Sequence, residues 1–313
     1  MSRFSKFLLL LALCSVCLTG CKAKDTAAEE QPAAEQADTV TPQIVVQPEE
    51  AAQPSEQAEP QSKPVQIEQP QAAAATELQQ KADTLQQTAA QIGGTWSIGV
   101  IAPGQSSCVA ANSQAMQSAS LIKLYVAACV ERDRTKLQAQ EQYAGENDTL
   151  LLHMLSQSDN DATNTLTRRL GSGDAAAGMA VVNAYCKEQG YTDTSMGRLM
   201  LDFSATTDNY TSVRDCCMFL RAVLDGSVPG SDAILAALKQ QERTGKSPAG
   251  VPSGVQTANK TGELDTVEND AAIIWKGNEP YILCVMSGSL TSPGAAREQI
   301  TQISSEMYSY FAE

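Results

Sequence analysis

The sequence is poor in the residues that several common classes of site require. It contains a single histidine, His153, among 313 residues, and aromatic residues make up only 5% of the chain. One imidazole cannot form a histidine cluster for zinc, and no HExxH motif is present. It also leaves no catalytic Ser-His-Asp set, because His153 lies within an apolar run where a core or surface helix position is expected. We therefore predict no metal site and no cofactor.

Basic charge is also scarce. The formal net charge is −14, and Lys and Arg do not gather into a basic stripe. Nucleic-acid binding requires clustered cations to contact phosphates, so we exclude a nucleic-acid partner. Hydrophobic residues nevertheless make up 42% of the sequence, which is enough for a buried core in a chain of this length.

The first twenty-one residues have the pattern of a secretion signal. Arg3 and Lys6 precede an apolar run, which is followed by small residues and Cys21. The stretch Leu-Thr-Gly-Cys at 18–21 resembles a bacterial lipobox, in which the cysteine carries a lipid. A signal peptide with an incidental cysteine and an uncleaved anchor remain as alternatives. We predict a signal peptide at 1–20, lipidation of Cys21 and an extracytoplasmic protein anchored to the bacterial membrane.

Residues 21–75 are predicted to form a disordered tether. Between Lys22 and Ala75 there are seven of the thirteen prolines, ten acidic residues, three lysines and no aromatic residue. Such a segment cannot bury enough apolar surface to offset the entropy cost of ordering it. The remaining chain, 76–313, is predicted to be one folded domain.

The sequence of the folded part predicts strands near both ends and helices in the middle. Residues 77–91 have helical spacing of Leu78, Ala82 and Leu85, and strands are predicted at 95–102, 106–112, 254–261, 270–276 and 280–288. A helix is predicted from 294 to 311, and helices with short breaks from 121 to 241. We predict an α/β (α+β) fold in which a mostly antiparallel sheet is sandwiched by helices from both chain ends, beside an all-α lobe. The α/β lobe would comprise about 76–115 and 250–313, and the helical lobe about 116–249.

Six cysteines lie in this domain, at 108, 129, 186, 216, 217 and 284. Their wide and irregular spacing lacks the pattern of a disulfide framework. We predict that most of them are free and buried.

Three short motifs carry the chemistry: Ser120-x-x-Lys123, Ser158-Asp-Asn160 and Lys260-Thr-Gly262. With Ser118 as candidate N-cap, Ser120 and Lys123 share one face of a first helical turn, so Lys123 can take the proton of the Ser120 hydroxyl. An amine serves as a base when burial and a second cation disfavour its charged form. Lys260 is the candidate second cation, and an exposed surface lysine is the alternative for Lys123.

The other two motifs supply proton relay and substrate binding. Ser158 can pass a proton to a leaving group and Asn160 can orient an amide, while a purely helix-capping role for Ser158 and Asp159 is the alternative. Asn164 is predicted to be structural.

Lys260 and Thr261 suit a substrate carboxylate, and Gly262 permits close approach of a ligand to backbone. The backbone N–H groups of Ser120 and Glu263 are candidates for an oxyanion hole, and a turn without a ligand is the alternative.

In this order the motifs resemble those of class A β-lactamases and penicillin-binding proteins, and the likeness extends over about 77–313. SDNDATN and RTGKSPAGVPSGVQTANKTG match the family's surroundings of the second and third motifs, and TSVRDCCMFLRAVLDG its helix after the omega loop. The resemblance implies a β-lactamase/D,D-peptidase-like fold and acylation of Ser120. It implies as partner a small-molecule β-lactam, or the D-Ala-D-Ala-like peptide that it mimics. We predict a monomer.

One departure from the family affects turnover. Its class A members carry an omega-loop glutamate in an E-x-x-x-N stretch, which positions the deacylating water. Counting onward from the second motif places Thr194 at the acid and Arg198 at the asparagine. We predict a β-lactamase-like serine hydrolase whose deacylation is in doubt. A D,D-peptidase, penicillin-binding or esterase-like relative and a non-catalytic cell-wall-binding module are the alternatives.

Overall fold

The computed structural model describes residues 68–312. The predicted signal peptide, Cys21 and the tether up to residue 67 lie outside this range. Its helices are α1 (Glu68–Ala90), α2 (Lys123–Arg132), α3 (Arg134–Gln138), α4 (Glu146–Ser156), α5 (Asn160–Leu170), α6 (Ala175–Glu188), α7 (Val213–Leu224), α8 (Ser231–Leu238) and α9 (Pro293–Tyr310), with short 3₁₀ turns η1 (Ala119–Ile122) and η2 (Ser247–Gly250).

A five-stranded antiparallel sheet forms one layer, as predicted. Its spatial order is β2-β1-β7-β6-β5, and every neighbouring pair is antiparallel. The strands are β1 (Thr95–Ile101), β2 (Val109–Ala111), β5 (Thr257–Leu264), β6 (Val267–Lys276) and β7 (Glu279–Gly288). Two short strands, β3 (Met116–Gln117) and β4 (Tyr210–Thr211), pair separately.

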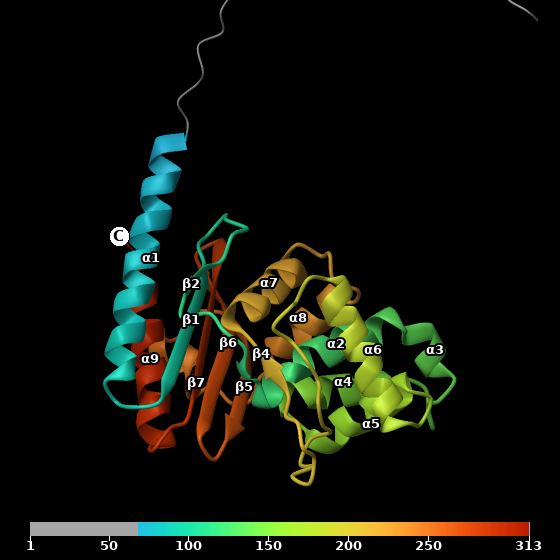
Figure 1. Cartoon of the computed structure of the whole chain (residues 1–313). Coiled ribbons are helices and arrows are strands. Elements are labelled where there is room, and N and C mark those ends of the chain that lie inside the picture. The colour runs from blue at the N-terminus through green and yellow to red at the C-terminus, as the bar shows by residue number, and fades with distance from the viewer. Residues whose placement is uncertain (1–67, 313) are drawn as a thin grey trace, which may run out of the picture. The chain divides into compact units, whose positions relative to one another are not determined.

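Helices from the two chain ends cover one face of this sheet. Figure 1 shows α1 and α9 side by side on that face, while α2 to α8 lie on the other. On α1 the predicted apolar positions Leu78, Ala82 and Leu85 are all buried. The helix begins at Glu68, before the predicted boundary at residue 76.

The helical middle departs from the prediction of short breaks. After α6 the chain runs from Gln189 to Asn209 without a helix and then enters β4. Three asparagine side chains hold this loop. Those of Asn164 and Asn183 each exchange two hydrogen bonds with loop backbone, at Met200 and Met196, and Asn209 accepts the N–H groups of residues 197 and 198. The structural role predicted for Asn164 is thus confirmed.

The cysteines of the described domain are all free. Cys108 is half-buried, and the other five are buried. No helix among residues 68–312 is both long and apolar enough to cross a membrane.

Candidate active site

Ser120 lies on the 3₁₀ turn η1, immediately before α2, and not in the first α-helical turn that the sequence favoured. Ala119 has a positive φ of 47°, and the Ser118 side chain makes no capping bond; its hydroxyl donates to the Ala119 carbonyl at 3.2 Å. Ser118 thus holds the predicted N-cap position, but it precedes a 3₁₀ turn and its side chain makes no capping hydrogen bond. A 3₁₀ turn still brings residues three apart onto one side, which keeps Ser120 and Lys123 on a common face.

The strand β5 lies directly against this turn. A Cβ atom on Gly262 would lie 2.6 Å from the Ser118 carbonyl oxygen and 3.3 Å from the Ser120 nitrogen. Glycine is required here because the strand approaches the backbone of the turn, whereas the sequence suggested approach to a ligand. Asn269 on β6 holds the same turn by donating to the Gln117 and Ser118 carbonyls at 2.9 and 3.2 Å.

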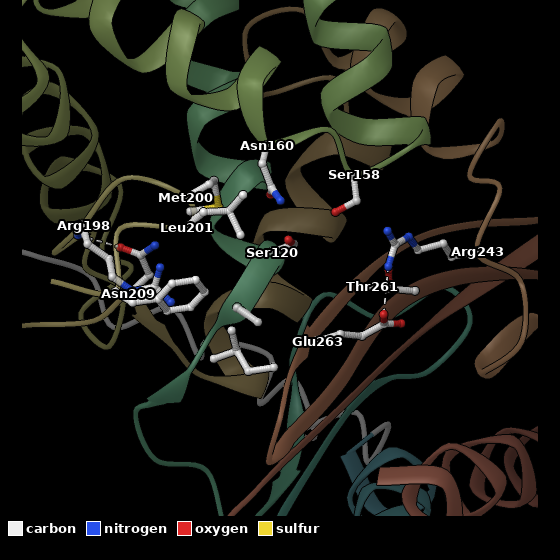
Figure 2. A pocket seen from close by; sticks show the side chains of 13 residues that line it. Ser120, Ser158, Asn160, Arg198, Met200, Leu201, Asn209, Arg243, Thr261 and Glu263 are labelled. Atoms are coloured by element: carbon white, nitrogen blue, oxygen red, sulfur yellow. Dashed lines mark hydrogen bonds and ion pairs between the residues drawn. The ribbon is translucent and has the colours of Figure 1, made fainter. Parts of the chain in front are cut away.

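A cavity opens between these elements. Ser120, Ser158 and Asn160 point toward its centre in Figure 2, with Thr261 and Glu263 on the β5 side. The remaining lining residues are Ala119, Arg198, Met200, Leu201, Phe203, Asn209, Arg243 and Leu264. The structure thus brings residues of all three motifs to one cavity, and His153 on α4 is not among them.

The Lys123 amine is fully buried and contacts Ser158 and Asn160, which line this cavity. It donates to the Ser158 carbonyl at 2.7 Å, to the Asn160 Oδ1 at 2.8 Å and to the Ser158 Oγ at 3.2 Å. Burial lowers its pKa to about 7, against the opposing charge of Asp159 and with help from Arg243. A neutral amine has two N–H groups, enough for the two carbonyl oxygens, and in that form its lone pair faces the Ser158 hydroxyl, which can donate to it.

Lys260, the second buried lysine, meets the same serine from β5. Its amine donates to the Ser158 Oγ and to the Thr261 carbonyl, both at 2.8 Å. Burial holds its pKa well below the usual value, and the charge of Lys123 acts in the same direction. The Ser158 hydroxyl therefore joins two amines, which is the arrangement a proton relay needs. The capping role falls to Asp159, whose carboxylate accepts from the Ala162 N–H at 2.7 Å.

Strained backbone gathers at this cavity. Ala119, Ser158 and Leu201 line it with φ values of 47°, 60° and 63°. Positive φ is unfavourable for residues with a side chain, most of all for bulky ones, and such positions concentrate at functional sites.

The sequence predicted that Thr194 stands where the family has its omega-loop glutamate, and this prediction is wrong. The hydroxyl of Thr194 is bonded to the Thr211 hydroxyl and the Asp215 carboxylate, both at 2.8 Å, and does not line the cavity. The cavity wall on this side is formed by Met200 and Leu201, next to Asn160 in Figure 2. The number of residues between the second motif and this wall depends on the path of the loop. The local sequence does not determine that path, so counting along the chain could not locate Met200 and Leu201.

The sequence did not predict a charge network that links Glu263 to Arg243 and Lys246, and Lys246 to Glu268. Glu263 contacts Arg243 at 2.8 Å and Lys246 at 3.2 Å, and the buried Glu268 contacts Lys246 at 2.6 Å and Arg297 at 2.7 Å. These two cations, Arg243 and Lys246, explain why a charged residue, Glu263, can directly follow the third motif. The only local signal was the excess of basic residues in ERTGK at 242–246.

A protein-family model matches more than half of this chain. Residues 136–311 match the model of the "Beta-lactamase enzyme family". The chain belongs to this family. It is a β-lactamase-type serine hydrolase with the predicted fold. A search of curated proteins gave no match to this β-lactamase-family chain.

Several solved structures resemble this β-lactamase-family protein. A β-lactamase from Sphaerobacter thermophilus DSM 20745 is 21% identical with a TM-score of 0.64, covering 74% of this chain and 97% of that one. PBP-A is 25% identical with a TM-score of 0.64, covering 76% and 96%. A mutant of PBP-A, 24% identical over 76% and 97% with a TM-score of 0.64, was solved as an acyl-enzyme complex with penicillin G.

Proposed function

We propose that this protein forms an acyl-enzyme on Ser120 with β-lactams or D-Ala-D-Ala-like peptides, and that it releases the acyl group slowly. The observation that carries the proposal is the buried Lys123 amine, whose pKa near 7 makes a neutral base available beside the Ser120 turn. The penicillin acyl-enzyme of the PBP-A mutant supports the substrate class by similarity.

In the acylation step, the Ser120 oxygen attacks the amide carbonyl carbon while its proton passes to Lys123. Collapse of the tetrahedral intermediate breaks the carbon–nitrogen bond. The leaving nitrogen takes a proton through the Ser158 hydroxyl, which lies 3.2 Å from the Lys123 amine and 2.8 Å from that of Lys260. The N–H groups of Ser120 and Glu263 would bind the oxyanion.

Slow deacylation follows from the carboxylates at the cavity. Among the described residues that line it, Glu263 is the one acid, and Arg243 and Lys246 already hold its carboxylate. Met200 and Leu201 stand on the opposite wall and cannot take a proton from water. Loss of a general base costs roughly 10² to 10⁴ in rate. This favours penicillin-binding or D,D-peptidase-like behaviour over efficient β-lactam hydrolysis.

Mass spectrometry after exposure to penicillin G tests the proposal. The whole drug mass should be added to Ser120, and the adduct should persist after excess drug is removed. A folded protein that keeps unmodified Ser120 at saturating drug would exclude acylation and favour the cell-wall-binding alternative. Rapid turnover of a chromogenic cephalosporin would instead exclude slow deacylation.

The extracytoplasmic location belongs to the same proposal, supported by the lipobox-like residues 18–21 and the proline-rich acidic segment after them. Cys21→Ser should release the protein from the membrane fraction of the producing cell, whereas Cys108→Ser should leave it there.

A further inference from the structure

Glu263 and Arg243 face each other at the rim of the cavity, on the β5 side. Figure 2 shows the carboxylate directed at the guanidinium, and the two are 2.8 Å apart. Both line the same cavity as Ser120. The Arg243 side chain is 50% exposed and that of Glu263 is 28% exposed, so a molecule entering the cavity can reach either group.

The other cations near the cavity are already engaged. The Lys260 amine is bonded to the Ser158 hydroxyl and the Thr261 carbonyl. Arg198 is paired with Asp208 at 2.6 Å, on the opposite side of the cavity in Figure 2. Arg243 is thus the guanidinium beside β5 to which a substrate carboxylate can bind, and its partner is another carboxylate.

Glu263 also has a second cation available. The Lys246 amine is 3.2 Å from its other carboxylate oxygen, and this lysine is buried and held by Glu268. The Glu263 carboxylate can therefore give up Arg243 and keep Lys246. The exposed pair with Arg243 is the weaker of the two contacts, since water screens exposed pairs more strongly than buried ones.

We propose that Glu263 competes with the substrate's own carboxylate for Arg243, and so sets the preference between anionic and neutral acyl donors. This inference rests on the proposed acylation of Ser120. A bound anionic substrate must displace Glu263 from the guanidinium and then lie beside its negative charge. A substrate whose carboxylate is masked meets neither cost.

Penicillin G and its methyl ester form a matched pair for the test, because they differ only at the carboxylate, which the ester masks with a methyl group. Acylation of Ser120 is followed by mass spectrometry in the wild type, in Glu263→Gln, and in the control Glu242→Gln. Glu242 is an exposed acid that bonds to Gln157 and does not line the cavity. Glu263→Gln should raise the second-order rate with penicillin G by roughly tenfold, with less than about a twofold change for the ester. The control should change neither.

The single variant Arg243→Gln and the double variant Glu263→Gln with Arg243→Gln separate competition from simple repulsion, because the gain from Glu263→Gln without the guanidinium is the difference between these two. If the carboxylates compete for the guanidinium, removing Arg243 should abolish most of the gain with penicillin G. A gain that persists in the double variant, or one equal for acid and ester, would overturn the inference while leaving acylation intact. Absence of any adduct with both compounds in folded wild type would overturn the proposed function, and this inference with it.

Discussion

Three buried lysines lie around this site, and they have two different surroundings. Lys123, Lys260 and Lys246 are each no more than 2% exposed. The amine of Lys246 contacts the carboxylates of Glu263 and Glu268, whereas Lys123 and Lys260 donate only to uncharged oxygens. Burial removes water from all three amines, but an adjacent carboxylate replaces it only for Lys246. Partners, and not depth, separate the lysines suited to catalysis from the structural one.

Replacing Lys123 should have the largest effect on activity. Lys123→Met should lower the rate of Ser120 acylation by about 10² to 10⁴, because the general base is lost. The free energy of unfolding of this variant should change by less than about 1 kcal/mol. The variant loses the hydrogen bonds of the amine, but it no longer has to bury an amine without a charged partner. The rate of penicillin adduct formation measures the effect on acylation, and urea unfolding measures the effect on stability. Lys187→Met, at an exposed site on α6, is the control. Acylation within about threefold of wild type would remove Lys123 from the mechanism.

The reverse result is expected for Lys246. Lys246→Met leaves the fully buried Glu268 with Arg297 alone, and breaking a buried ion pair in this way costs about 3 to 5 kcal/mol of stability. Urea unfolding measures the loss, and Lys239→Met, at an exposed position, should cost far less. Equal stability of the Lys246 and Lys123 variants would invalidate the distinction between the two surroundings.

A smaller effect is expected where β5 meets the Ser120 turn. Gly262→Ala should destabilise the protein by about 1 to 3 kcal/mol, because the added methyl group would lie 2.6 Å from the Ser118 carbonyl oxygen. Acylation should slow as well, since the strand must move away from the turn. Gly294→Ala is the control, because an added Cβ there meets nothing within 4 Å. Unchanged stability and activity of Gly262→Ala would contradict the close packing.

Features that depend on neighbouring residues could be predicted from the sequence, whereas features that depend on contacts between distant segments could not. Strands, end helices and the three motifs depend on local spacing, so 3.6-residue and alternating patterns indicated them. The loop carrying Met200 could not be placed from spacing, because Asn164 and Asn183 fix it through contacts between distant segments. The pairing of Lys246 with Glu268 likewise depends on how η2 lies against β6, which no local pattern encodes.

The pH dependence of Ser120 acylation tests the central claim most directly. The neutral form of Lys123 predominates above its pKa of about 7. The second-order rate with penicillin should therefore rise about tenfold per pH unit well below 7 and level off above about 8, because the base must be unprotonated. A rate that is flat from about pH 5.5 to 8.5, or still rising toward about pH 10 as for an ordinary lysine, would contradict the account.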